Sequence, residues 1–294
     1  MNDSSSRSGR FLGRVVGSVL VAFVLMGDPA IVFGWGDRAH RMINEEAITT
    51  LPESLRSFFA AHRRELSDCA VEPDSVFRAR YGRKEAVRHF IDLDLYGSPP
   101  FSELPRSYRA AVERFGRDTV VERGALPWTL LRMHSRLVRE IRGGDWVRAI
   151  RTAGLAGHYV ADAFMPLHTT ANYDGQETGQ RGVHHAIEDQ LVDARIETFH
   201  DRMRGRIRPA SADPFTPERV FAFLLESYAD APVVLRADQE ARKLGRIGSS
   251  RYLNALDERT GNALTARLAS GVSTLGSFWL SAWTEAGHPT PPPP

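Results

Sequence analysis

The chain has 294 residues, 42% of them hydrophobic, which is enough apolar material for a substantial buried core. Its 38 basic and 36 acidic side chains nearly cancel, so the composition lacks the strong basic excess with which proteins usually bind duplex nucleic acid. The only cysteine, Cys69, excludes an internal disulfide and is expected to be a packed thiol.

Residues 1–34 have the three parts of a secretory signal peptide. Three arginines give a positive start, residues 15–26 form an apolar run, and small or tolerated residues precede a cut after Gly34. The run is shorter than the roughly 20 residues that span a bilayer. We therefore expect cleavage before Trp35 and a periplasmic or secreted protein, with an uncleaved membrane anchor as the alternative. Cleavage removes three arginines and two aspartates, so the net charge changes from +2 to +1.

Apolar residues recur at helical spacing along most of residues 35–288, which predicts one all-α domain. Strand signals are scarce, although 87–95 has a locally extended pattern. Residues 171–182 are rich in Asn, Asp, Gln and Gly and are expected to form a loop. The Pro-rich end, 289–294, is expected to be a disordered tail. The expected helices cover the region around 39–48, then 126–141, a segment capped by Asp145 and ending at Met165, 184–199, 217–228 capped by Thr216, and one or two helices over 251–283.

Two helical pairs combine histidine with a carboxylate. His158 and Asp162 are four residues apart, as are His184 and Glu188, so each pair lies on one helix face, and His168 follows the first pair. Zinc takes imidazole nitrogen and carboxylate oxygen as ligands. A single His-x3-Asp is more often a surface pair, but the whole series is uncommon by chance in a chain with ten histidines. It predicts a site for neighbouring metal ions between facing helices.

A second pair competes with the later one. His185 and Asp189 have the same spacing, but their face points about 100° away from that of His184. Only one of the two pairs can therefore face the site.

With these residues identified, the chain resembles the zinc-dependent phospholipase C and single-strand nuclease superfamily. Members are all-helical and exported, and they bind three zinc ions with the help of an N-terminal Trp. The resemblance covers essentially all of the mature chain. It adds Trp-Gly-Asp-Arg-Ala-His at 35–40, Asp74 in Glu-Pro-Asp, and His89 fifteen residues later. The metal ligands that it implies are Trp35, His40, Asp74, His89, His158, Asp162, His168, His184 and Glu188.

The resemblance also implies a role for several of these residues and the ion that each would bind. Asp162 would bridge two ions that together acidify a shared water, and Asp74 would orient that water for attack. The α-amino group of Trp35 would give up its proton to a metal at little cost, because its pKa is near roughly 7.7–8. The implied sets are Asp74, His89, His158 and Asp162 for one zinc, Trp35, His40 and Asp162 for a second, and His168, His184 and Glu188 for a third.

The leading expectation is an exported zinc phosphodiesterase with a phospholipase C-like preference. The short Trp35–His40 spacing resembles the nucleases, whereas Glu188 in place of Asp resembles the phospholipase C/D branch. The nucleases have an Arg three residues after the first Asp, where this chain has Phe77 and then Arg78. The runner-up is a single-strand nuclease or nucleotidase, and a non-catalytic metal-binding protein is the alternative of another class. We expect a monomer that acts on phospholipid or single-stranded nucleic acid, with peripheral membrane contact in the first case and no protein partner.

Overall fold

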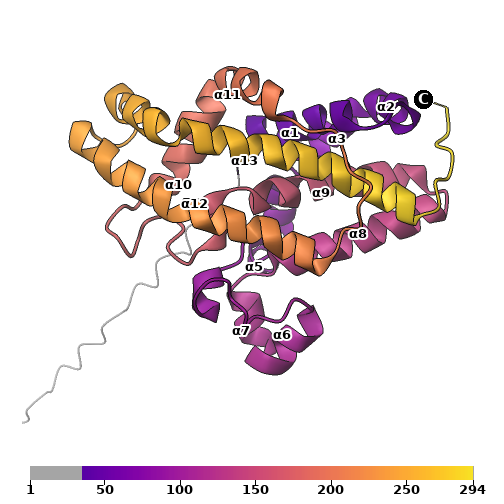
Figure 1. The fold of residues 1–294 in the computed structure, drawn as a ribbon, viewed down its shortest axis with the longest axis horizontal. Helices are drawn as coiled ribbons and strands as arrows, with labels where there is room; N and C mark the ends of the chain where they lie inside the picture. The colour runs from indigo at the N-terminus through magenta and orange to yellow at the C-terminus, as the bar shows by residue number, and fades with distance from the viewer. Residues whose placement is uncertain (1–34, 294) are drawn as a thin grey trace, which may run out of the picture. The chain divides into compact units, whose positions relative to one another are not determined.

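Two long helices, α12 (Pro217–Leu244) and α13 (Ser250–Glu285), lie side by side along the length of the protein (Figure 1). The structure is a computed structural model that describes residues 35–293. These residues contain no β-strand and fall in one compact unit, which confirms the expected all-α class. The expected signal peptide, 1–34, lies outside the described residues.

α13 is the helix around which the others assemble. It contacts α1, α8, α9, α11 and α12, and its Trp279 indole donates a hydrogen bond to the carbonyl of Ala153 at 3.1 Å. The bounds of the remaining helical segments are α1 Asp37–Thr50, α2 Glu53–Ala61, α3 Arg63–Cys69, α4 Arg78–Tyr81, α5 Arg83–Ala86, α6 Tyr108–Phe115, α7 Arg117–Glu122, α8 Leu126–Arg142, α9 Trp146–Ala163, α10 Val183–His185 and α11 Ile196–Met203. Short π or 3₁₀ segments are η1 Pro73–Phe77, η2 Leu93–Tyr96, η3 Pro166–Thr169, η4 Ala186–Val192, η5 Asp193–Arg195 and η6 Arg204–Arg206.

Asp145 fixes the start of α9, Pro166 fixes its end, and Gly154 allows the helix to pack closely against α3. The Asp145 side chain accepts a hydrogen bond from the Arg148 amide at 3.2 Å, as expected of a cap. The helix ends at Ala163, two residues before the expected Met165, because the residue before Pro166 is extended. Within α9, a Cβ on Gly154 would lie 2.7 Å from the Cβ of Cys69, so this glycine permits close contact with α3.

Two expected helices differ from the structure. α12 does not end at residue 228 but continues through Pro232 to Leu244. Packing along α13 holds the helix together there, although Pro232 removes one backbone hydrogen bond. The helix expected over 184–199 is helical but irregular, since it passes from α10 through the π-helix η4 and the 3₁₀ turn η5 into α11. Residues 251–283 belong to one helix rather than two.

The loop at 171–182 is irregular, as expected, and is tied firmly to α12. Gln180 donates to the buried Asp238 carboxylate at 2.7 Å, and Arg242 donates to the same carboxylate at 2.7 Å and to the Gln180 carbonyl at 2.7 Å. Asp174 accepts hydrogen bonds from the amides of Gly182 at 2.9 Å and His184 at 3.3 Å. The loop therefore holds the start of α10, and with it His184, in one position.

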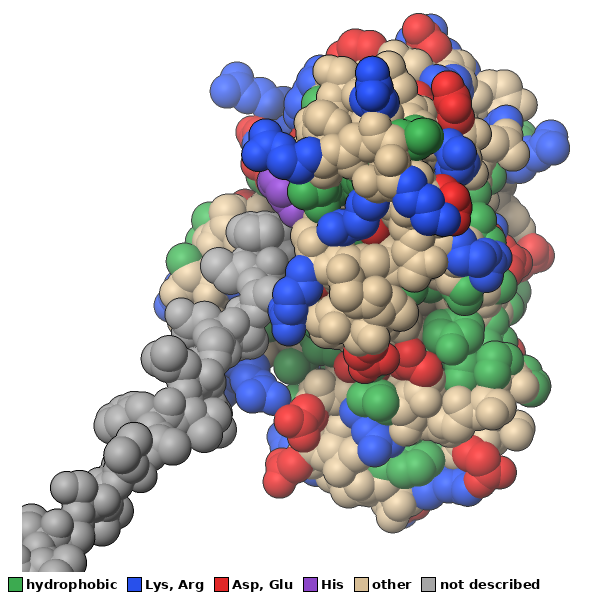
Figure 2. Space-filling view, turned by 90° about the vertical axis from the view of Figure 1, so that its left-hand side faces the viewer, with side chains coloured by type: hydrophobic (Ala, Val, Ile, Leu, Met, Phe, Trp, Pro, Cys, Tyr) green, Lys and Arg blue, Asp and Glu red, His purple; other side chains and the backbone are tan. Residues whose placement is uncertain are grey.

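The surface carries both signs of charge. Acidic and basic side chains both occur on the face in Figure 2, as the small net charge suggests. None of the described helices combines the length and apolar character needed to cross a membrane.

Residues 288–293 have no regular structure, and the Pro289 carbonyl accepts a hydrogen bond from the Trp283 indole at 2.8 Å.

Candidate metal centre

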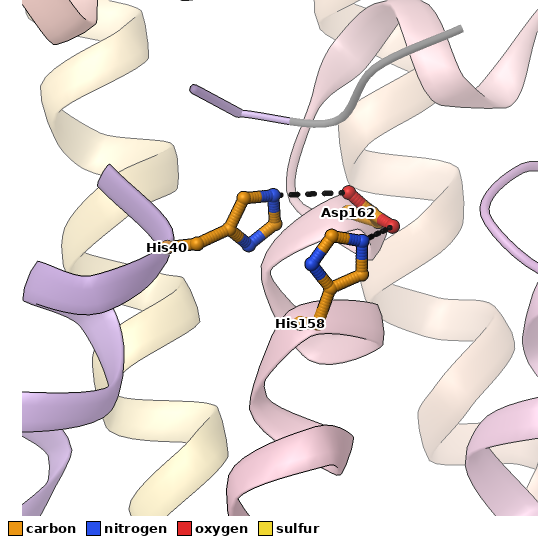
Figure 3. Close-up of side chains that lie close together, drawn as sticks. All are labelled: His40, His158 and Asp162. Carbon is orange, nitrogen blue, oxygen red and sulfur yellow. Dashed lines mark ion pairs between the residues drawn. The ribbon is translucent and has the colours of Figure 1, made fainter. Parts of the chain in front are cut away.

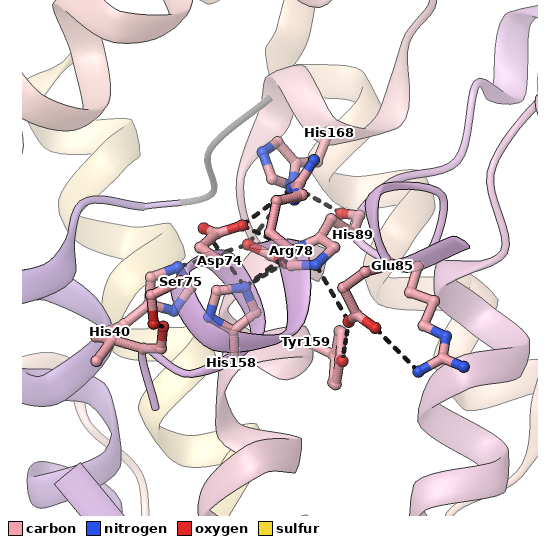
Figure 4. A network of polar contacts seen from close by, with 12 residues as sticks. His40, Asp74, Ser75, Arg78, Glu85, His89, His158, Tyr159 and His168 are labelled. Carbon is pink, nitrogen blue, oxygen red and sulfur yellow. Dashed lines mark hydrogen bonds and ion pairs between the residues drawn. The ribbon is translucent and has the colours of Figure 1, made fainter. Parts of the chain in front are cut away.

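The structure brings eight of the nine expected ligand residues together through their side chains. They come from α1, η1, the turn after α5, α9, η3, α10 and η4, and seven of them are buried, while the Asp74 side chain is 8% exposed. Figure 4 labels five of them: His40, Asp74, His89, His158 and His168. Their ligand atoms form three groups in which every atom lies within 4.8 Å of the others. The groups are His40 with His158 and Asp162, Asp74 with His89 and His158, and His168 with His184 and Glu188.

His89 faces three of the other candidate ligand residues. Its Nδ1 lies 2.9 Å from His158 Nε2, 3.0 Å from Asp162 Oδ2 and 3.4 Å from Asp74 Oδ1. The other nitrogen of His158, Nδ1, lies 2.7 Å from the Ala70 carbonyl oxygen. Because a carbonyl can only accept, His158 Nδ1 carries the proton and Nε2 presents its lone pair to the group. This is the way in which metal-binding histidines are commonly oriented.

His40 contributes to an adjacent group from α1. Its ring stacks on His158 with centroids 4.0 Å apart and an angle of 13° between the rings. His40 Nε2 lies 3.6 Å from Asp162 Oδ1, while His158 Nε2 lies 3.3 Å from Asp162 Oδ2 (Figure 3). The two oxygens of Asp162 therefore face two different groups of ligands, which is the arrangement of a bridging carboxylate.

The third group presents three atoms that could bind a cation. His168 Nδ1 lies 2.8 Å from the His89 carbonyl oxygen, and His184 Nδ1 lies 3.1 Å from that of Tyr173. In the neutral rings both protons are therefore on Nδ1, so two lone pairs face each other across the 3.2 Å between the Nε2 atoms. Glu188 Oε1 lies 2.8 Å from His184 Nε2 and 3.5 Å from His168 Nε2. A cation at this position could be bound by the two Nε2 lone pairs together with the Glu188 carboxylate.

Two further observations test whether the residues fit metal ions. Within residues 35–293, both ring nitrogens of His40 and both oxygens of Asp162 and Glu188 are buried without a hydrogen bond of good geometry. Tetrahedral zinc with bonds of about 2.0–2.1 Å places neighbouring ligand atoms about 3.3 Å apart. The separations between ligand atoms given above, 2.8 to 3.6 Å, lie around that value. Buried His, Asp and Glu clusters that can hold metal ions are thus present.

The charged groups influence each other strongly in the metal-free protein. Burial opposes ionisation of Asp74, but the neighbouring His158 and His89 lower its pKa to about 2. Burial also opposes a charge on His89, yet the adjacent Asp162 carboxylate and then the charge of Asp74 raise its pKa to about 9. For His40, burial comes first and the charge of His158 second, and they lower the pKa to about 3. The Asp74 carboxylate is therefore ionised at neutral pH.

Burial raises the pKa of Glu188 well above its usual range, and the charge of Asp162 adds to the effect. Asp162 has the opposite shift, because the nearby His158 and His168 hold its pKa well below the usual range against the effect of burial. A fully buried carboxyl near other carboxylates ionises only when positive charge is close. A bound cation would supply that charge at Glu188.

Glu85 lies next to the His89 ring, and it is not among the site residues predicted from the sequence. It is fully buried, and its Oε1 lies 3.5 Å from His89 Nε2, on the side of the ring away from the ligand group. Tyr159 donates its hydroxyl proton to Glu85 Oε1, and Arg88 donates to Oε2 at 3.1 Å (Figure 4). The four-residue spacing of Glu85 and His89 is the same signal that marked the other pairs and would have identified it.

Arg78 also reaches the centre. Its Nη2 donates to Asp74 Oδ1 at 3.0 Å, and its side chain is largely buried (Figure 4). The sequence argued against a nuclease-type phosphate contact, because Phe77 occupies the place of the nuclease Arg, and it made no prediction about a contact between Arg78 and Asp74. The π-helical turn η1 (Pro73–Phe77) leads directly into α4, which begins with Arg78.

Trp35 lies beside the centre through its side chain. Its indole donates a hydrogen bond at 3.0 Å to the carbonyl of Ala161, the residue before Asp162. The start of α1 is held by Asp193, whose carboxylate accepts hydrogen bonds from the amides of Arg38 at 3.1 Å and Ala39 at 2.8 Å. The first described residues are therefore anchored to α9 and η5.

The competing pair faces solvent. His185 Nδ1 lies 2.7 Å from Asp189 Oδ2, and both side chains are exposed. Of the two offset pairs, His184 and Glu188 are the ones that face the centre, as the sequence required of one of them. Cys69 is buried and unpaired, which agrees with a packing role.

Comparison with known proteins gives no relative. No protein-family model matches the chain, and neither does any curated protein. Membership of the superfamily therefore remains a proposal that rests on the residues described above.

Proposed function

We propose that this protein is an exported zinc-dependent phosphodiesterase of the phospholipase C and single-strand nuclease superfamily, with a phospholipase C-like preference. The observation that carries the proposal is the bridging position of Asp162, whose two oxygens face two adjacent groups of ligands. A structural zinc site is usually closed by four protein ligands. Groups of three side chains each, two of which share His158, instead leave positions open for water and suit hydrolytic chemistry.

The proposed reaction is hydrolysis of a phosphate ester by water. Zinc, when bound, supplies Lewis acidity and lowers the pKa of a coordinated water towards neutrality. Asp162 would hold two cations close together. The Asp74 carboxylate, ionised at neutral pH, would accept a hydrogen bond from the attacking water and orient it. Arg78, which donates to Asp74, would place a positive charge near the phosphate.

A feature of the segment that carries Asp74 favours a phospholipid substrate. Val76 is 54% exposed and Tyr81 is 46% exposed, and the neighbouring Arg80 and Arg83 are exposed as well. Exposed apolar and basic side chains together suit peripheral contact with an anionic lipid surface. A lipid whose headgroup enters the centre would meet these side chains as it leaves the membrane.

The Arg78–Asp74 contact favours the second candidate, a single-strand nuclease or nucleotidase. An arginine at this position offers a phosphate group both charge and directed hydrogen bonds. Single strands also need little net positive charge on the protein when bases stack on aromatic side chains.

Zinc content and a substrate panel test the proposal on the mature protein beginning at Trp35. We expect close to three zinc ions per chain, hydrolysis of phosphatidylcholine faster than of single-stranded DNA or RNA, and loss of activity to a chelator with recovery on addition of zinc. His184→Ala should lose zinc and activity, whereas the matched change His185→Ala should not. Active protein with one ion or none would overturn the three-ion arrangement. Zinc retention without hydrolysis of any of these substrates would indicate a non-catalytic metal-binding protein.

A further inference from the structure

A cavity of about 630 Å³ is lined in part by Tyr159, whose ring packs edge-on against His89 and His158. Its walls come mainly from α8, with Tyr108 at the start of α6 and Arg88 after α5. Its volume is typical of pockets that bind small molecules. No ligand of the proposed metal ions lines it, so it is a separate space.

The cavity carries a surplus of positive charge. Four arginines line it, and two of them are neutralised, since Arg88 pairs with Glu85 at 3.1 Å and Arg136 pairs with Glu140 at 2.7 Å. The other two, Arg132 and Arg139, have no acidic partner within residues 35–293, and their only side-chain bond is the one from Arg132 to Thr129 Oγ1 at 3.0 Å.

The positions of the arginines on α8 bring their charges to one side of the cavity. Residues 132, 136 and 139 follow one another at intervals of four and three, so they share a helix face. Desolvation, followed by the positive charge of Arg88, lowers the pKa of the Arg132 guanidinium. Both effects would be relieved by an anion, which would bring a negative charge next to Arg132.

The rest of the wall combines aromatic rings with the hydroxyls of Ser107, Thr129 and Ser135, and two of the rings use their polar atoms in hydrogen bonds. The Trp128 indole donates to the Arg106 carbonyl at 3.0 Å, and the Tyr159 hydroxyl donates to the buried Glu85. Tyr108 packs edge-on against Trp128 with ring centroids 5.5 Å apart. A ligand would thus meet both aromatic surface and the guanidinium donors of Arg132 and Arg139 in one space.

We propose that this cavity binds a small amphipathic anion: one sulfonate, phosphate or carboxylate group attached to an aromatic or short acyl body. The anionic group would accept hydrogen bonds from Arg132 and Arg139, and the apolar body would lie against Tyr108 and Trp128. The inference is independent of the proposed hydrolysis, because none of these four side chains belongs to the metal centre.

Titration calorimetry on the full mature protein tests this inference. The probe is naphthalene-1-sulfonate, whose anion is a poor ligand for zinc, and the comparison compound is the uncharged 1-(methylsulfonyl)naphthalene, which has no acidic proton with which to bind zinc. We expect one bound sulfonate per chain, an affinity that falls with added salt, and at least tenfold weaker binding of the sulfone.

Arg132→Gln and Arg139→Gln should each weaken sulfonate binding roughly tenfold, the loss expected for one charge-assisted hydrogen bond. Arg64→Gln is the matched control, because that side chain is 97% exposed and does not line the cavity. Both cavity arginines are exposed, so their loss should not prevent folding, which circular dichroism verifies. Equal affinity for the two probes, or unchanged affinity in both arginine variants, would overturn the proposal.

Discussion

The backbone of Gly157 on α9 lies directly against the carboxamide of Asn44 on α1. A Cβ on Gly157 would lie 1.8 Å from Asn44 Oδ1, so no larger residue fits without displacing that side chain. Asn44 in turn donates to the carbonyls of Leu66 at 2.7 Å and Gly154 at 2.9 Å. His158 follows Gly157, and one helical turn separates the ligand of α1 from Asn44. This contact therefore sets the distance at which two imidazoles of the metal centre stack.

Gly157→Ala should both destabilise the protein and loosen its metal centre. The added methyl group must displace Asn44 and push α1 away from α9, at a cost of roughly 1–3 kcal/mol typical of an overpacked core. Urea unfolding and zinc content measure the two effects. The control is Gly205→Ala, where a Cβ would meet nothing within 4 Å. Matching stability and zinc content in the two variants would show that the Asn44 contact does not position the ligands.

Asp162→Asn should reduce zinc content and phosphodiester hydrolysis more than Glu188→Gln. Both oxygens of Asp162 face ligand groups, whereas Glu188 Oε1 faces only the histidines of the third group. Losing the bridging charge should weaken the binding of two ions and their joint action on water. Metal analysis and initial rates on the two purified variants provide the measurement. Equal and mild effects would argue against a bridging role.

Extending the chain before Trp35 should abolish most activity while leaving the helical fold in place. A peptide nitrogen has no available lone pair, so an extended chain cannot offer the amine that the proposed second ion requires. His40 and Asp162 alone are too few to hold zinc tightly. The comparison is between protein that begins at Trp35 and protein with a Met-extended start, by zinc content, circular dichroism and hydrolysis. Equal activity would remove the N-terminal amine from the ligand set.

Glu85→Gln should lower zinc affinity by about 10–100-fold, the usual effect of losing a carboxylate that orients a metal-binding histidine. The amide keeps the size of the side chain but loses the negative charge beside His89 Nε2. Competition with a chromogenic chelator measures the affinity. Glu122→Gln is the control, because its pair with Arg83 lies on the surface. An unchanged zinc affinity with an intact fold would show that Glu85 only packs against the ring.

His134 should make the protein less stable as the pH falls from about 7 to about 4. Burial lowers its pKa from 6.5 to about 4, so the folded state favours the neutral ring and the unfolded state takes up a proton first. Its contribution is fully present above pH 6.5 and is lost as the pH falls through about 4, by up to about 3 kcal/mol. The measurement is the difference in unfolding free energy between wild type and His134→Phe across this range. A difference that does not change with pH would contradict the buried neutral imidazole.

The sequence alone was sufficient for the helical class and for naming the eight residues whose side chains the structure brings together in the candidate metal centre. Pairs such as His184 and Glu188 lie within one turn, so the helical period determines that they share a face whatever surrounds them. The same period marked the offset pair of His185 and Asp189, and only packing decided which pair is buried. The extent of α12 beyond residue 228 likewise depended on α13, since the sequence around Pro232 by itself argues for an end.

Only the tertiary structure decided how the candidate ligand residues approach one another and which neighbouring residues contact them. The stacking of His40 on His158, the contact of Arg78 with Asp74 and the support from Glu85 join residues on different elements or across an irregular turn. The cavity on α8 is likewise assembled from five separate parts of the chain. The spacing of residues along the sequence indicates which side chains share a face of one helix. Which faces then approach each other, and how closely, is set by the volume of the residues packed between them, as the absent side chain of Gly157 shows.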